Sequence, residues 1–172
     1  MAKPTLEVCF RGPFSAMPGS LYINLLKELA KLNGLYLWTI EYESGFLVNY
    51  VGKTIQGFAS RFAQHAKWVG SGKDVLDPDY FSLGENWLVE NPTPETILKC
   101  VAHYRVFVAD LDCDELLLLL IEKALIQRFL SVGGKCKEFL GNKQRSRVES
   151  PSQPVFVRSE SVIHGLGDYV LI

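Results

Sequence analysis

Two strand-like runs joined by a short turn constrain the fold of this chain most strongly. Residues 34–42 (GLYLWTIEY) are rich in aromatic and β-branched side chains, a turn containing Gly45 follows, and residues 46–54 (FLVNYVGKT) return. This pattern predicts an antiparallel β-hairpin with Tyr36 and Tyr50 facing each other across it. Aromatic cross-strand pairs are common in ordinary hairpins, so the hairpin alone indicates no function.

A helix with a basic side is predicted directly after the hairpin. Residues 58–70 (FASRFAQHAKWVG) place Arg61 and His65 at i and i+4, so a guanidinium and an imidazole lie on one stripe of that helix. The stretch from 55 to 73 has basic residues and no acidic ones, and its lysines are Lys67 and Lys73. This local charge suits a phosphate-bearing partner, although a solvated helix face explains it equally well.

A third feature is a carboxylate set in an apolar helix. Residues 112–130 (DCDELLLLLIEKALIQRFL) predict a long helix that opens with a capping box of Asp112 and Glu115. The neighbours of Glu122 at i−4, i−3, i+3 and i+4 are all apolar. Burying a carboxylate there costs several kcal/mol unless it is paired or bound to a metal. Glu122 is therefore predicted to be either a metal ligand or the partner of a buried arginine.

A second basic segment surrounds Asn142. The candidate DNA-contacting residues in it are Lys143, Arg145 and Arg147, and the wider stretch 134–147 contains Glu138 as its single acid. The whole chain nevertheless has a formal net charge of −1 and a pI of about 6.3. A nucleic-acid partner must then bind one focused face, and a basic surface loop without a partner is the alternative.

Length and composition favour one α/β (α+β) domain with extensions. The chain has 172 residues, of which 48% are hydrophobic, enough for one core and too few for two domains of usual size. We expect an N-terminal extension at 1–33 with a helix at 20–32, a core at 34–142 with an insertion at 70–94, and a C-terminal extension at 143–172. Further strands are predicted at 103–109 and 168–172.

The four cysteines show no C-x-x-C pair and no ligand-like spacing with histidine, so they indicate neither a zinc site nor a disulfide framework. The N-terminus lacks the features of a signal peptide, and the leucine-rich run after Asp114 is short and follows acidic residues. We therefore expect a cytoplasmic protein that does not span a membrane.

The order of these residues resembles the GIY-YIG nuclease family. The triplets Gly34-Leu35-Tyr36 and Tyr50-Val51-Gly52 are similar to the two motifs that name it, with Leu and Val in place of Ile. The later positions that match are Arg61, His65, Glu122 and Asn142. The resemblance implies a small domain with a central three-stranded antiparallel sheet flanked by helices. The compact chain and His65 look most like the stand-alone type II restriction enzymes of the family.

The resemblance also implies a division of chemical roles. Glu122 would hold one Mg²⁺ or Mn²⁺ ion, and Arg61 would stabilise charge on the phosphate. Tyr36 would orient or deprotonate the attacking water, which requires that Lys53, Arg61 or the metal lower its pKa. Tyr50 and His65 would position phosphate and water, and Asn142 would support the site.

The implied activity is hydrolysis of double-stranded DNA to 5′-phosphate and 3′-hydroxyl ends. A restriction enzyme of this kind would cut both strands either as a homodimer or by sequential nicking, and it would work beside a cognate methyltransferase. Two alternatives stay open. One is a structure-specific repair or mobile-element nuclease, and the other is a catalytically silent nucleic-acid-binding module.

Overall fold

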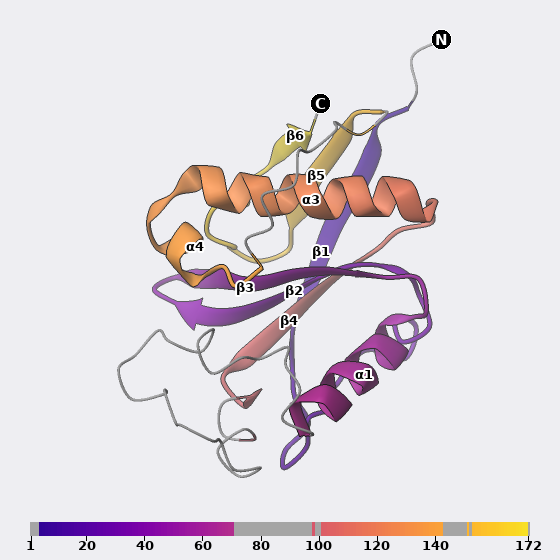
Figure 1. The fold of residues 1–172 in the computed structure, drawn as a ribbon, viewed down its shortest axis with the longest axis vertical. Helices are drawn as coiled ribbons and strands as arrows, with labels where there is room; N and C mark the ends of the chain where they lie inside the picture. The colour runs from indigo at the N-terminus through magenta and orange to yellow at the C-terminus, as the bar shows by residue number, and fades with distance from the viewer. Residues whose placement is uncertain (1–3, 71–97, 99–100, 143–150, 152, 172) are drawn as a thin grey trace.

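The computed structural model describes residues 4–70, 98, 101–142, 151 and 153–171, which form a mixed α/β fold (Figure 1). The described elements in chain order are β1 (Leu6–Ser15), β2 (Gly34–Tyr42), β3 (Gly45–Thr54), α1 (Phe58–Gly70), β4 (Tyr104–Asp110), α3 (Glu115–Val132), α4 (Gly134–Phe139), β5 (Val155–Ser159) and β6 (Tyr169–Leu171). Within these residues no helix is long and apolar enough to cross a membrane.

The sheet has six strands in the order β3-β2-β4-β1-β5-β6, so the prediction of a three-stranded sheet is wrong. The three expected strands do lie together, because β2 pairs antiparallel with both β3 and β4. The sheet continues through β1, which runs antiparallel to β4 and parallel to β5. The segments predicted as extensions therefore supply the other three strands of the same sheet.

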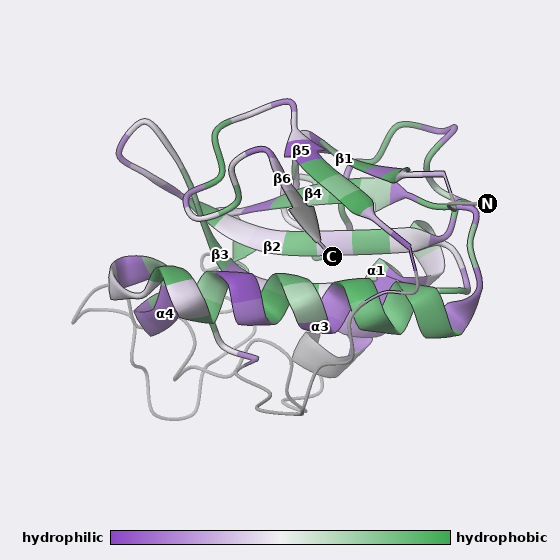
Figure 2. Ribbon diagram, turned by 90° about the horizontal axis from the view of Figure 1, so that it is seen from above, coloured by the Kyte–Doolittle hydropathy of each residue, from purple (hydrophilic) through white to green (hydrophobic). Residues whose placement is uncertain are grey.

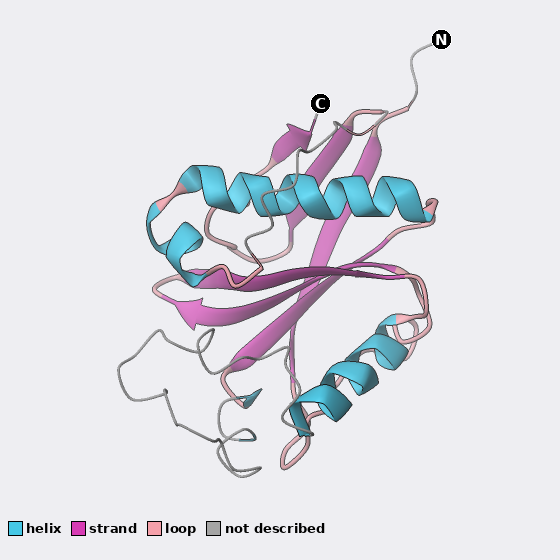
Figure 3. Cartoon of the chain, in the orientation of Figure 1, coloured by secondary structure: helices cyan, strands magenta, loops and turns pink. Residues whose placement is uncertain are grey.

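The N-terminal segment differs most from its prediction. Strand β1 was not predicted, and its Val8 and Phe10 are fully buried. The helix predicted at 20–32 is wrong: the residues between β1 and β2 are loop and turns (Figure 3), with a bridge between Ala16 and Ile23. Tertiary packing overrides the helical spacing here. Leu29 enters the core, and the backbone carbonyls of the loop accept hydrogen bonds from the first turn of α1.

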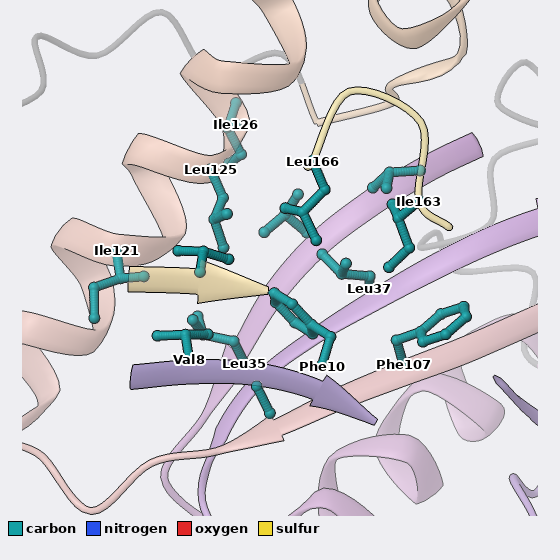
Figure 4. Packing of buried hydrophobic residues seen from close by; sticks show 14 of the residues in the cluster. Val8, Phe10, Leu35, Leu37, Phe107, Ile121, Leu125, Ile126, Ile163 and Leu166 are labelled. Carbon is teal, nitrogen blue, oxygen red and sulfur yellow. The ribbon is translucent and has the colours of Figure 1, made fainter. Parts of the chain in front are cut away.

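The two long helices cover opposite faces of the sheet. Alternate residues of β2 point to different sides: Leu35 and Leu37 join the core that contains residues of α3, whereas Tyr36 and Trp38 join the core that contains residues of α1. Figure 4 shows Ile121 and Leu125 of α3 near Val8 and Leu35. In Figure 2, hydrophilic bands interrupt the hydrophobic surface of α3. Glu122 lies on this helix, one residue after the fully buried Ile121.

The helix predictions hold well in this part of the chain. The helix predicted at 58–70 is confirmed as α1. The helix predicted at 112–130 is α3, but its N-cap is Asp114 and not Asp112, since the Asp114 carboxylate accepts from the N–H of Leu117 at 2.8 Å. The predicted terminal strand is confirmed as β6, which pairs with β5.

Strand β3 is an edge strand whose outer side is covered almost along its length. The N–H of Phe46 donates to the carbonyl of Val162 at 3.0 Å, and the N–H of Gly141 donates to the carbonyl of Asn49 at 2.7 Å. Further along, the side chain of Asn142 pairs with the backbone of Val51. These contacts protect the edge. They also bring the α3–α4 region beside the end of β3, where the candidate site lies.

Candidate active site

Tyr36 and Gly52 lie opposite each other in the β2–β3 hairpin, and Tyr50 lies opposite Trp38, so the prediction that Tyr36 and Tyr50 face each other across the strands is wrong. A Cβ atom added to Gly52 would lie 2.3 Å from Cζ and 2.4 Å from the hydroxyl oxygen of Tyr36. Any side chain at position 52 would therefore displace the phenol. The glycine of the second triplet is explained by this close approach of the Tyr36 ring across the sheet surface.

The hydroxyl of Tyr36 joins two residues of α1. It lies 2.8 Å from Nε2 of His65 and accepts a hydrogen bond from Nε of Arg61 at 3.1 Å. Because a guanidinium can only donate, the hydroxyl hydrogen of Tyr36 is directed at one of its other partners, His65 Nε2 or the hydroxyl of Tyr50. Burial, and then the charge of Arg61, lower the pKa of His65 to about 3. His65 is therefore a neutral imidazole.

Tyr50 completes an aromatic group above the sheet. Its ring stacks near that of Tyr36, with centroids 6.1 Å apart and planes inclined by 23°. Its hydroxyl also interacts with Arg61. Burial acts to lower the pKa of Arg61, but the two phenols outweigh it and the pKa is raised. Arg61 therefore stays charged while it binds both tyrosines.

Glu122 reaches the same group from α3. Burial raises the pKa of its carboxyl to about 7, against the opposing charges of Lys53, Arg61 and Lys123. The Glu122 carboxylate in turn acts to raise the pKa of both Tyr36 and Tyr50. Residues of α1 and α3, which cover opposite faces of the sheet, thus lie within electrostatic reach of one another near the end of β3.

The pKa of Tyr36 shifts in the direction opposite to the one its predicted role requires. Burial is the largest cause and raises this pKa, the nearby Tyr50 adds to the rise, and Arg61 only partly opposes it. The expectation that Arg61 or Lys53 makes Tyr36 acidic is therefore wrong for this structure. Desolvation of a phenol that is 0% exposed outweighs a single neighbouring cation.

Lys53 lies at the rim of this group. Its ammonium forms an ion pair with the exposed Glu115 at 2.9 Å, and its charge acts to lower the pKa of Glu122. Lys53 thus stands between two carboxylates of α3. The arginine that corresponds to the predicted partner of Glu122 is Arg61, whose charge lowers the pKa of Glu122 and which also donates to Tyr36 and Gln64.

Asn142 contacts the backbone of β3. Its Oδ1 accepts from the N–H of Val51 at 3.1 Å, and its Nδ2 donates to the carbonyl of Val51 at 2.6 Å. This two-point contact fixes the edge strand between Tyr50 and Gly52. Asn142 therefore acts on the tyrosine group through the position of the strand.

The predicted DNA-contacting residues are only partly placed. Lys67 is exposed on α1, whereas Lys73, Lys143, Arg145 and Arg147 lie outside the described residues, as do residues 71–94 of the predicted insertion. The sequence reasoning missed Gln64, which accepts from Nη1 of Arg61 at 3.1 Å. Its position three residues after Arg61 on a predicted helix is the signal that could have identified it.

A hard cation fits the chemistry of Glu122. Mg²⁺ prefers oxygen ligands and is bound in many enzymes by one or two carboxylates together with water and substrate phosphate. Glu122 is a partly exposed carboxylate whose burial raises its pKa to about 7, so a bound cation would relieve an unfavourable charge. Among the described residues no group of three or more His, Cys, Asp or Glu side chains gathers to hold a metal. A metal at Glu122 would take its other ligands from water and substrate.

No protein-family model matches this chain, and neither a curated protein nor a solved structure matches it. The functional assignment therefore rests on the chemistry and geometry of the residues described above.

Proposed function

We propose that this protein is a metal-dependent endonuclease that hydrolyses phosphodiester bonds of double-stranded DNA at a specific sequence, in the manner of a type II restriction enzyme. One observation carries the proposal. Arg61 and His65 bind a single phenol, Tyr36, and the carboxylate of Glu122 lies within electrostatic reach of that phenol and of Tyr50. A phosphate-binding cation, two phenols and a metal-binding oxygen are the groups that this hydrolysis needs.

The exposure of the residues indicates which of them meet the substrate. Tyr50, Arg61 and Glu122 are partly exposed. Tyr36 and His65 are buried, with 0% and 2% of their surface exposed. Arg61 and Tyr50 therefore bind the phosphate from the α1 side. Tyr36 holds the guanidinium from beneath, and one such fixed donor can be worth about 3 to 4 kcal/mol of transition-state stabilisation.

Tyr36 acts in this site as a neutral phenol. Burial raises its pKa, and the pKa of the neighbouring His65 is lowered to about 3, so transfer of the phenol proton to His65 is strongly unfavourable. Both phenols have their pKa raised by burial and by the charge of Glu122. A divalent cation bound at Glu122 would offset that carboxylate charge, neutralise phosphate oxygens and stabilise the leaving 3′ oxygen, giving 5′-phosphate and 3′-hydroxyl products.

The restriction assignment brings two further partners. The described part of each chain contains one such group of residues, so cutting both strands of a duplex at it requires a homodimer or two successive nicks. A cognate methyltransferase would protect the same sequence in the host. The second candidate is a structure-specific nuclease of repair or of a mobile element, which would share the chemistry and recognise DNA shape instead of base edges.

The test is to incubate the protein with plasmid or phage DNA and Mg²⁺ and to sequence the ends. We expect cuts at one short recurrent sequence, because several bidentate base contacts of about 1 to 3 kcal/mol each give discrete products. Glu122→Ala should abolish cleavage and keep DNA binding in Ca²⁺. Glu138→Ala on α4, which removes an exposed carboxylate paired with Lys135, is the matched control and should cut normally.

Cleavage confined to branched substrates would contradict the restriction assignment and favour the structure-specific nuclease. Binding without cleavage under any divalent ion would contradict both and leave a silent binding module. Full activity of a folded Glu122→Ala protein would show that Glu122 is not the metal ligand.

A further inference from the structure

The guanidinium of Arg61 is held at two of its nitrogens by side chains from different elements. Its Nε donates to the hydroxyl of Tyr36 in β2 at 3.1 Å, and its Nη1 donates to Oε1 of Gln64 in α1 at 3.1 Å. A planar group held at two nitrogens cannot turn about its own bonds without losing one of these contacts. The plane of the guanidinium is thus fixed before any substrate arrives.

Gln64 is itself held in one orientation. Because its amide oxygen accepts from Arg61, its amide nitrogen must find a different acceptor. Gln56, in the turn between β3 and α1, provides one: Nε2 of Gln64 donates to Oε1 of Gln56 at 2.9 Å. The backbone N–H of Gln56 donates in turn to the hydroxyl of Thr54 at 3.1 Å. A chain of hydrogen bonds therefore runs from the end of β3 through the two glutamines to Arg61.

We infer that Gln64, supported by Gln56, is a positioning residue that fixes the guanidinium of Arg61 for phosphate binding. The inference that this matters for catalysis rests on the proposed nuclease function. The choice of an amide is informative. A carboxylate at position 64 could accept from Arg61 in the same place, but it could not donate to Gln56, and its charge would pair with Arg61 and compete with the phosphate. A neutral acceptor restrains the guanidinium and leaves its charge available.

Two substitutions at position 64 distinguish the restraint of the Arg61 guanidinium from the availability of its charge. Gln64→Leu removes the acceptor and keeps the charge of Arg61. We expect kcat to fall about 10- to 100-fold, the loss seen when groups that orient a metal ligand are removed. The dissociation constant for DNA in Ca²⁺ should change little. Gln64→Glu should lower kcat and also weaken DNA binding. Ser60→Ala, at an exposed position of the same helix, is the control and should change neither quantity.

A double-mutant cycle tests whether Gln64 acts through Arg61. Arg61→Lys removes the planar fork that Gln64 holds. In that background we expect Gln64→Leu to lower kcat by no more than about twofold, because coupled residues give non-additive effects. Equal fold losses in both backgrounds, or an unchanged kcat for Gln64→Leu alone, would overturn the inference.

One readout does not depend on cleavage. NMR of the arginine Nε–H group reports how firmly Arg61 is held, and its hydrogen should exchange with solvent faster in Gln64→Leu than in the parent protein or in Ser60→Ala. Unchanged exchange would show that Gln64 does not restrain Arg61, even if the protein cuts DNA. Absence of cleavage by the parent protein, together with faster exchange in Gln64→Leu, would contradict the proposed nuclease and support the positioning role.

Discussion

The α1 side and the α3 side of the tyrosine group are built by different physical means. On the α1 side, Tyr36, Arg61 and Gln64 are fixed by short hydrogen bonds between 2.8 and 3.1 Å. On the α3 side, Glu122 has a backbone hydrogen bond from Lys53, and burial makes its charge unfavourable, which Lys53, Arg61 and Lys123 only partly offset. The comparison indicates that one half of the group is arranged in advance, whereas the other half gains stability when a cation binds.

The largest expected effect tests the hydrogen bonds on the α1 side. Tyr36→Phe removes the hydroxyl that Arg61 and His65 share, so turnover should fall by orders of magnitude in a steady-state cleavage assay. Stability should fall by about 1 to 3 kcal/mol, because buried donors and acceptors lose their partner. Normal turnover of a folded Tyr36→Phe protein would show that the phenol serves packing alone.

The next prediction concerns the space that Tyr36 occupies. Gly52→Ala would put Cβ 2.3 Å from Cζ of Tyr36, and such overpacking typically costs about 1 to 3 kcal/mol in urea unfolding. The cost should largely disappear when Tyr36→Ala supplies room in the same chain. Additive losses in the double variant would mean that Gly52 is needed for its backbone and not for this contact.

A third prediction tests Glu122 on the α3 side through the pH dependence of protein stability. Burial raises the pKa of Glu122 from 4.5 to about 7, so the folded chain binds this proton more tightly than the unfolded chain. Stability from this group is fully present below pH 4.5 and is lost as pH rises toward 7, by up to about 3 kcal/mol. Above pH 7 the loss is complete and constant.

The matched comparison for that prediction is Glu122→Gln, which cannot ionise. In metal-free urea unfolding, the free energy of unfolding of the parent protein should fall relative to that of this variant as the pH rises from about 4.5 to about 7.5. Mg²⁺ at pH 7.5 should stabilise the parent and leave the variant unchanged. A difference that stays constant with pH would place the Glu122 carboxyl in water.

The sequence predicted those parts of the site that depend on local spacing. Alternation in residues 34–54 predicts the hairpin, and the four-residue interval places Arg61 and His65 on one stripe of a helix. That Tyr36 and Arg61 share one site was implied only by the family resemblance. Strands β1 and β5 were missed because they pair with each other, joining Leu6 to Val155 across most of the chain. The Gly12-Pro13 pair inside β1 also reads as a break in a strand.

The pKa of Tyr36 could not be predicted for a related reason. Its direction depends on how completely the phenol is buried, and that depends on Phe62 and His65, whose rings lie 5.3 and 5.6 Å from it. These packing distances are set by how α1 lies on the sheet. A sequence shows which cation is near Tyr36, but it does not show how much water is excluded.

The smallest expected effect lies at the rim, where Lys53 pairs with Glu115. Glu115→Gln breaks an ion pair whose carboxylate side chain is 59% exposed, so stability should fall by less than about 1 kcal/mol. The released ammonium of Lys53 can then act more strongly on Glu122 and compete with a cation there. We therefore expect Glu115→Gln to need more Mg²⁺ for half-maximal cleavage.

Glu138→Gln is a close match for this change, because it breaks a second exposed Lys–Glu pair, at 2.8 Å, on α4. Both variants should lose similarly little stability in urea unfolding. Only Glu115→Gln should shift the Mg²⁺ dependence, since Lys135 is not among the cations that act on Glu122. Equal Mg²⁺ dependence in the two variants would mean that Lys53 does not compete with the cation at Glu122.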